Sequence, residues 1–271
     1  MRRLINQRPA RAERLALGVL PFVVLLLLYV MASQLRLAAN PGDKLLPSFA
    51  SMGQSIHDYA FTQDARSGQY LLWADTWASL KRIGSALAIS AVAGLLLALV
   101  IGTVPRLRAL LSPLLGTVAM IPPLAVLPIL FILLGLEETA KIALIVIGVM
   151  PCIARDLSLH VADLPQEQLV KAQTLGASTW QLALRVMLPQ TLPRLIDVLR
   201  LNMGAAWLFL IAAEAIASTG GLGYRIFLVR RYLAMDVILP YVAWITLLAV
   251  ASDLLLRLIR ARAFAWAEAG R

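Results

Sequence analysis

Long uncharged apolar runs alternate with short polar stretches along this chain. The runs cover residues 15–35, 83–104, 110–134, 142–154, 201–217 and 237–256, and only the last two contain a charge, Glu214 and Asp253. A helix of about 17–25 apolar residues can cross the hydrocarbon of a bilayer. The fourth run is shorter, but its flanking residues Lys141 and Arg155 have long side chains that can reach the interface. We therefore predict an all-α integral membrane protein with six transmembrane helices.

Composition supports this class and argues against several others. Apolar residues make up 60% of the 271 positions and the mean hydropathy is +0.79, whereas soluble domains contain about 45–50% apolar residues. The net charge of +10 fits basic flanks lying against anionic lipid, so we expect no nucleic-acid partner. The lone Cys152 excludes an intramolecular disulfide, and His57 and His160 lack metal-ligand spacing. With no phosphate-binding loop or catalytic motif, we expect no catalytic residue, metal or cofactor.

Basic residues predict the orientation. A cytoplasmic N-terminus places 16 of the 25 Lys and Arg residues inside, including five arginines that precede the first run. The expected order is a basic N-terminus (1–14), a first transmembrane helix (15–35), an extracytoplasmic segment (36–79), a five-helix core (80–260) and a cytoplasmic tail (261–271). The first run could instead be a signal peptide, but it exceeds the usual apolar length of about 7–15 residues. The role of the polar 36–79 segment stays open.

Small residues recur along one face of the second run. They are Gly84, Ala88, Ala91, Gly94, Ala98 and Gly102. Such a stripe allows helix backbones to approach closely inside a membrane. It therefore predicts a packing face.

The longest predicted cytoplasmic loop, 156–195, has an amphipathic pattern. Pro165 can open a helix that Gly176 ends, and Ser178 or Thr179 can cap a second helix that Pro189 stops. The second helix is expected to present its apolar side chains on one broad face. Across the two helices, the apolar positions are Leu169, Ala172, Leu175, Trp180, Leu182 and Val186. The pattern predicts a helix pair lying flat beneath the membrane, although an interfacial connector has the same periodicity.

This segment resembles the cytoplasmic signature of binding-protein-dependent ABC importer permeases, which is E-A-A, three residues, Gly, nine residues and I-x-L-P. The matching positions are Ala172, Gly176, Val186, Leu188 and Pro189, with valine in place of isoleucine. Val170 and Lys171 replace the glutamate and the first alanine of the signature.

A second resemblance comes from other parts of the chain. The stretches IPPLAVLPI (121–129), LLGLEETAKI (133–142) and AAEAIASTGGLGYRI (212–226) resemble the nitrate, sulfonate and taurine branch of these permeases. Together the similarities cover about residues 80–256.

The resemblance implies a type I ABC importer permease of the inner membrane, working as a homodimer. The helix pair would couple to a cytoplasmic ABC ATPase dimer, and an extracytoplasmic solute-binding protein would deliver a small polar solute. That solute would be nitrate-, sulfonate- or taurine-like, or a urea- or guanidine-like nitrogen compound. The implied ATPase-coupling residues are Leu169, Ala172, Leu175, Gly176, Trp180, Val186, Leu188 and Pro189. Two other classes stay open: a secondary transporter, which would need more intramembrane ionisable groups, and a membrane scaffold without a pathway.

Candidate pathway and gate residues lie in the third and fifth runs. Pro122, Pro123 and Pro128 each lack an N–H donor, which membrane helices tolerate where they line a cavity or pack on neighbours. Glu214 has no charged partner one turn away, whereas Asp253 can pair with Arg257. A carboxylate at mid-membrane costs about 2.5–3.5 kcal/mol on insertion scales, so we expect Glu214 to face the protein interior. We hypothesise that it braces the turn containing Gly221 and Gly223 and so shapes an outer gate; the alternative is a purely structural buried hydrogen bond.

Overall fold

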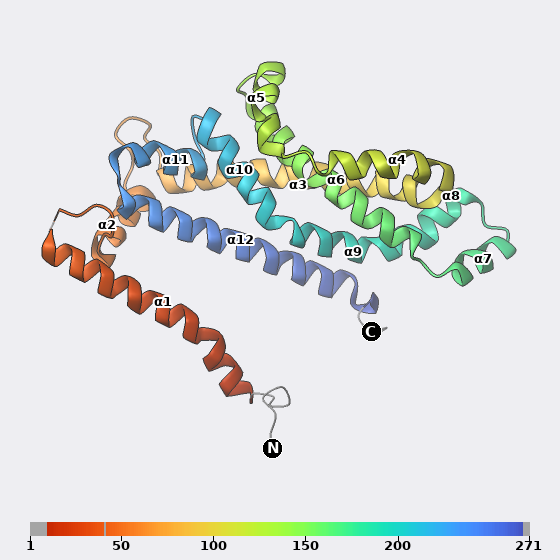
Figure 1. The fold of residues 1–271 in the computed structure, drawn as a ribbon, viewed down its shortest axis with the longest axis horizontal. Coiled ribbons are helices and arrows are strands. Elements are labelled where there is room, and N and C mark those ends of the chain that lie inside the picture. The colour runs from red at the N-terminus through yellow and green to blue at the C-terminus, as the bar shows by residue number, and fades with distance from the viewer. Residues whose placement is uncertain (1–9, 41, 268–271) are drawn as a thin grey trace.

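The computed structural model describes residues 10–40 and 42–267, and these residues form helices and loops without a strand. The first nine residues of the predicted basic N-terminus and the last four of the predicted tail lie outside the described residues. The elements run in the order α1 (Arg11–Ala39), α2 (Phe49–Phe61), α3 (Leu71–Thr103), α4 (Pro105–Val118), α5 (Pro123–Leu134), α6 (Glu138–Ala162), α7 (Gln166–Thr174), α8 (Thr179–Gln181), η2 (Leu182–Met187), α9 (Leu188–Leu201), α10 (Met203–Ala217), α11 (Leu222–Val229), η3 (Arg230–Tyr232), α12 (Met235–Ala263) and η4 (Ala265–Ala267) (Figure 1).

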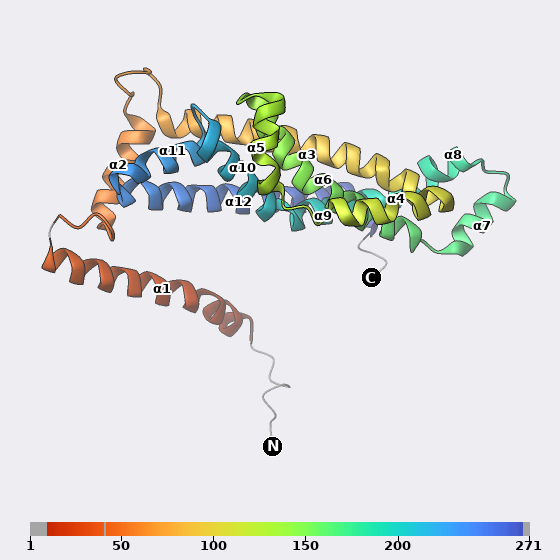
Figure 2. The same cartoon turned by 45° about the horizontal axis from the view of Figure 1, so that its top comes forward.

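The prediction of six spans agrees with the helices found. Within the described part of the chain, five helices are long and apolar enough to cross a membrane: α1, α3, α6, the combined helix Thr179–Ile216, and α12. The pair α4 and α5 makes a sixth if it counts as one bent span. Helix α1 diverges from the other helices in both ribbon views (Figure 2), and its apolar window is not buried by the rest of the chain.

The third predicted span is sharply broken. Helices α4 and α5 meet at 93°, and α5 projects from the body of the molecule (Figure 1). Pro122 and Pro123 lie at the corner, where neither can donate a backbone hydrogen bond and where Ile121, preceding a proline, is disfavoured in helical conformation. Pro128 lies inside α5 without breaking it. The break between α4 and α5 therefore occurs where two consecutive residues have no backbone N–H to donate to the helix.

Helix α3 begins much earlier than the sequence suggested. It starts at Leu71, whereas the apolar run begins at residue 83, so the predicted 36–79 segment contains α2 and the first turns of α3. Ser48 caps α2 by accepting a hydrogen bond from the Ser51 N–H at 3.1 Å. The start of α3 was not predicted because its first turns contain polar residues, which are typical of a solvent-exposed segment. In the structure three of them, Asp75, Thr76 and Ser79, are buried.

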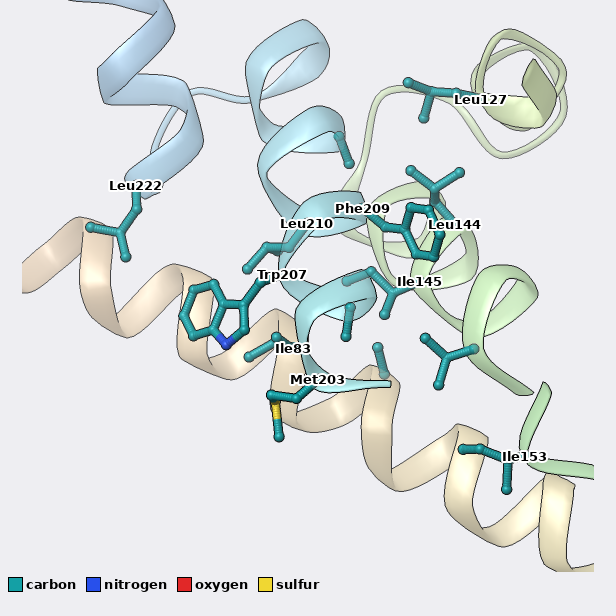
Figure 3. Close-up of a cluster of buried hydrophobic side chains, with 14 of the residues drawn as sticks. Ile83, Leu127, Leu144, Ile145, Ile153, Met203, Trp207, Phe209, Leu210 and Leu222 are labelled. Atoms are coloured by element: carbon teal, nitrogen blue, oxygen red, sulfur yellow. The ribbon is translucent and has the colours of Figure 1, made fainter. Parts of the chain in front are cut away.

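The core forms where α3, α6 and α10 pack together (Figure 3). Gly94 and Gly102 let α6 approach: a Cβ added to Gly94 would lie 2.7 Å from Ile153 Cγ2, and one added to Gly102 would collide with Val161. Gly84 and Ala88 are exposed instead. The predicted packing stripe therefore contacts α6 at Gly94 and Gly102, whereas its first two residues, Gly84 and Ala88, are not covered by the described part of the chain.

The prediction that Pro189 stops a helix is wrong. A π-helical stretch, η2, leads directly into α9, and the Leu188 N–H donates to the carbonyl of Ala183, five residues earlier. The helix thus widens just before the residue that has no N–H, in the manner of π-bulges. The chain passes through Pro189, and Thr179–Ile216 forms one long helical unit.

Gly102→Val tests the contact between α3 and α6. The added side chain has no room beside Val161, so we expect a loss of about 1–3 kcal/mol of stability, measured as a lower thermal unfolding midpoint of the purified protein. Gly84→Val is the matched control because a Cβ there meets nothing within 4 Å. Equal midpoints for the two variants would contradict this packing.

Candidate functional site

The turn 218–223 is held by side chains from two helices. Three successive N–H groups each donate to a side-chain oxygen: Gly221 to Asp75 Oδ1 (2.9 Å), Leu222 to Ser79 Oγ (2.9 Å) and Gly223 to Glu214 Oε2 (2.8 Å). These N–H groups lie at the start of α11, where a helix leaves its first donors without intrahelical partners. Acidic side chains are favourable at this positive end of a helix. Side chains therefore hold the turn at three consecutive backbone N–H groups.

Helix α3 supplies its part of this site from one face. Asp75, Ser79 and Arg82 are spaced four and three residues apart, which places them one above another along the helix. All three are buried, with relative exposures of 3%, 0% and 7%. A polar stripe of this kind is retained inside a protein only when its groups are bonded.

Glu214 is fully buried and its carboxylate is saturated with donors. Besides Gly223, it accepts hydrogen bonds from the Ser79 hydroxyl at 2.8 and 3.0 Å and from Arg82 Nη1 at 2.7 Å. The guanidinium supplies the opposite charge that a carboxylate needs away from water. Glu214 thus joins α10 to α3 and to the turn.

Arg82 is the centre of a wider ionic cluster, which we define as Arg82, Glu138, Lys141 and Glu214. Its Nη1 also donates to the carbonyl of Gly220 at 2.7 Å. Its Nε and Nη2 donate to the two carboxylate oxygens of Glu138 at 2.6 and 2.8 Å, and Lys141 Nζ donates to the same carboxylate at 2.9 Å. The cluster contains two cations and two anions, and it links α3, α6, α10 and the turn.

A second ion pair continues the site towards α11 and α12. Arg225 Nε lies 2.8 Å from Asp75 Oδ2. One residue along α3, Thr76 Oγ1 accepts a hydrogen bond from Trp244 Nε1 at 2.9 Å. The Trp244 ring in turn meets Trp73 edge to face, with centroids 5.7 Å apart. Polar side chains of α3 therefore hold α11 and α12 together at this end of the molecule through an ion pair and a hydrogen bond.

The two glycines predicted at the gate are required sterically. Gly221 has φ 126°, and an added Cβ would lie 2.6 Å from Arg82 Nη1 and from the Glu214 carboxylate. A Cβ on Gly223 would lie 2.7 Å from the carbonyl oxygen of Ile211. The structure thus brings Glu214, Gly221 and Gly223 together, as hypothesised, while the Ser218 hydroxyl donates to the Gly220 carbonyl (2.6 Å).

The three prolines predicted for the pathway lie elsewhere. Pro123 packs near Gly148 and Phe209, where a Cβ on Gly148 would lie 3.0 Å from Pro123 Cγ. Pro122 and Pro128 are exposed. The candidate pathway residues therefore divide between the α4–α5 corner and the turn 218–223.

The predicted helix pair is present as α7 and α8, at the opposite end of the body from α11 (Figure 1). Gly176 has φ 85°, its N–H donates to Gln173 O (2.9 Å), and the Ala177 N–H donates to Ala172 O (3.0 Å). This is the Schellman arrangement that ends helices at glycine. Within this chain a Cβ on Gly176 meets nothing within 4 Å, so the backbone conformation, rather than a close contact, requires glycine.

Ser178 opens the second helix through a capping box. Its side chain accepts a hydrogen bond from the Gln181 N–H (3.3 Å), and its own N–H donates to Gln181 Oε1 (2.8 Å). The predicted common face of this helix is wrong, because Trp180 is 71% exposed while Leu182 is only 5% exposed.

Among the large apolar side chains of the helix pair, two are the most exposed, ahead of Val170 at 54%. Leu175 and Trp180, which we call the coupling tip, are 85% and 71% exposed. Leu169 and Leu188 instead pack on a small core formed by Leu99, Val161, Leu164 and Met187. Ala172, Val186 and Pro189 are half-buried. The predicted coupling residues thus separate into an exposed tip and an anchored base.

Near the same end, charged residues of α9 and α12 pair with one another. The predicted pair of Asp253 with Arg257 is confirmed at 2.9 Å, and Arg200 also reaches Asp253 at 2.7 Å. Asp197 pairs with Arg260 at 3.1 Å. These contacts hold α9 on α12.

Most polar residues of this site were not predicted from the sequence. Asp75, Ser79, Arg82 and Glu138 were assigned no role, and Lys141 was expected only to flank an apolar run. The available signal was the spacing of the first three on one helical face.

Residues 90–264 match a protein family described as "Binding-protein-dependent transport system inner membrane component". The taurine transport system permease protein of Escherichia coli (strain K12) is 36% identical over 195 residues, covering 72% of this chain and 71% of that protein. The bicarbonate transport system permease protein of Synechococcus elongatus is 30% identical over 210 residues, covering 77% and 74%. Among solved structures, an inward-facing MetNI methionine ABC transporter chain aligns with a TM-score of 0.59 at 18% identity, covering 75% of this chain and 99% of that chain. This structural likeness supports the fold.

Proposed function

This chain belongs to the family of binding-protein-dependent transport system inner membrane components. From its structure we propose roles in import for the helix pair at one end and for the turn 218–223 at the other. The chain is a multi-pass inner-membrane protein and the transmembrane permease of an ABC importer for small solutes. It is a transporter subunit rather than a catalytic one. What remains to be assigned is where its partners bind and how they act on the pathway.

We propose that a cytoplasmic ABC ATPase dimer binds the coupling tip. The observation that carries this proposal is the exposure of Leu175 and Trp180, 85% and 71%, at the end of a helix pair whose base is anchored. Trp180 also borders an apolar groove of about 220 Å³ between the second helix and the C-terminal end of α3, with Leu96, Val100 and Leu184 among its lining. Large apolar side chains presented in this way are typical binding hot spots.

The combined helix Thr179–Ile216 can carry motion from this tip to the turn 218–223. It begins beside Trp180 and reaches Glu214 near its other end. A rigid displacement of the tip would therefore move the carboxylate that holds the Gly223 amide. On this account ATP hydrolysis by the separate ATPase opens and closes the turn, which acts as an outer gate.

The pathway and the remaining partners follow from this assignment. The α4–α5 corner at Pro122 and Pro123 forms part of the pathway wall, with Pro128 in the projecting helix, and a second copy of the chain completes the pathway as a homodimer. Both termini lie in the cytoplasm, so the α11 end faces outward, where a solute-binding protein delivers its cargo.

Taurine and bicarbonate, the solutes named for the relatives, both carry an oxyanion, and we assign this chain a small solute of that class.

Trp180→Ala tests the coupling tip. We expect the ATPase to be lost from the purified complex, because removing a hot-spot residue costs about 2 kcal/mol or more, or about thirtyfold in Kd. Trp77→Ala is a matched control, since Trp77 is equally exposed (71%) but lies near the other end of α3. The measurement is the ratio of ATPase to permease after affinity purification. An unchanged ratio for Trp180→Ala would return the helix pair to the role of an interfacial connector.

Glu214→Gln tests the gate. Glutamine can still accept the Gly223 hydrogen bond, but it leaves Arg82 without one of its anions. Although the variant should be less stable, we expect the folded permease to assemble with the ATPase, with a fall of about fivefold or more in solute transported per ATP hydrolysed. Ser79→Ala removes the hydrogen bonds that its hydroxyl donates to Glu214 and accepts from the Leu222 N–H without changing the charge of the site, and should have a smaller effect. Transport at the unmutated rate by Glu214→Gln would leave Glu214 with a structural role only.

A further inference from the structure

Two buried cations of the ionic cluster lie beneath one exposed carboxylate. The side chains of Arg82 and Lys141 are 8% and 4% exposed, whereas that of Glu138 is 54% exposed. Glu138 is thus the member of the cluster in contact with the surroundings. Its carboxylate covers the charged groups of the other two.

Arg82 is held in place from the side opposite Glu138. Its Nη1 is fixed by Glu214 Oε1 and by the Gly220 carbonyl, both at 2.7 Å. The Nε and Nη2 edge then faces the two oxygens of Glu138 in a bidentate pair. A guanidinium fixed in this way is pre-organised for any carboxylate, sulfonate or bicarbonate oxygen pair, because little side-chain entropy remains to be lost on binding.

Charge balance makes the position of Glu138 specific for an anion. With Glu138 in place, Arg82 and Lys141 are matched by Glu138 and Glu214. If the Glu138 carboxylate leaves, two buried cations face a single anion. A buried unmatched charge is strongly unfavourable, so a small oxyanion that replaces the carboxylate would restore both the charge and the hydrogen bonds.

Glu138 is the member of the cluster that lies nearest along the chain to the projecting α5. It is the first residue of α6, directly after residues 135–137, which connect α6 to the projecting α5. Gly135 at the end of α5 has φ 74°, which other residues rarely adopt. Lys141 lies one turn inside α6, and Arg82 lies on α3. A displacement of α5 would therefore draw Glu138 away from cations that stay in place.

We propose that Arg82 and Lys141 form an oxyanion-binding site of the permease, occupied in this conformation by the Glu138 carboxylate, and that the oxyanion group of the solute exchanges with Glu138 during transport. The inference deepens the proposed function and rests on it for the identity of the solute class. The binding site itself is a property of this chain alone.

The test uses Glu138→Ala in the full-length permease, purified in lipid discs, with methanesulfonate and acetate as probes and chloride to keep ionic strength constant. The truncation empties the site, so we expect a lowered thermal unfolding midpoint and a saturable recovery of about 2–4 °C as either probe is added. Combining it with Lys141→Met should abolish the recovery. Glu137→Ala, a neighbouring charge outside the cluster, should show no saturable response.

Three results would overturn the proposal: no recovery in Glu138→Ala, an equal recovery in chloride alone, or the same response in Glu137→Ala. If Glu138→Ala does not fold, Glu138→Ser gives the same test, because its short side chain also leaves the site without the carboxylate. Failure here would leave ATPase binding at the coupling tip intact. Conversely, failure of the Trp180→Ala experiment would leave the oxyanion titration valid, so the two conclusions can fail separately.

Discussion

The structure depends on the neutralisation of Glu214 inside a membrane-spanning helix. A carboxylate in the hydrocarbon costs about 2.5–3.5 kcal/mol on insertion scales, and an arginine costs a similar amount. Pairing the Glu214 carboxylate with Arg82 at 2.7 Å removes both problems at once, but only if α3 and α10 lie side by side at this point. The packing of Gly94 and Gly102 against α6 and the seating of the turn 218–223 are both compatible with that single alignment.

The same ion pair lies near one end of a long helical unit. Glu214 lies close to the end of a helical unit that starts at Thr179, beside the coupling tip. The base of the helix pair packs on a small core through Leu169 and Leu188, so the pair is anchored to the rest of the chain. The π-helical stretch between tip and span is an irregular part of this unit, as is the turn at Asn202 between α9 and α10, and π-helical stretches often lie at functional sites. In the proposed coupling, a partner that moves the tip would act on the turn through this helical unit and the Arg82–Glu214 ion pair.

Local sequence patterns predicted the elements better than their contacts. Apolar runs gave the spans because bilayer thickness sets helix length, and Gly176 marked a helix end because few other residues tolerate its φ of 85°. The bracing of Gly223 by Glu214 could be hypothesised because only nine residues separate them. The pairing with Arg82, 132 residues away, could not, since no local periodicity encodes it. The 93° corner and the continuous helix through Pro189 were missed for a related reason: proline shows where a donor is absent, but tertiary packing decides whether the helix bends or widens.

Arg82 and Glu214 should contribute to stability as one unit, and a double-mutant cycle measures the coupling between them. The unfolding free energies of Arg82→Met, Glu214→Gln and the double variant would be compared with that of the unmutated protein in the same lipid discs. Each single change should cost about 3–5 kcal/mol because it leaves one buried charge unmatched. The double variant should be more stable than the sum of the two losses implies, with a coupling energy of at least about 1.5 kcal/mol. Losses that add to within about 0.5 kcal/mol would contradict the account, because the two residues would then contribute to stability independently.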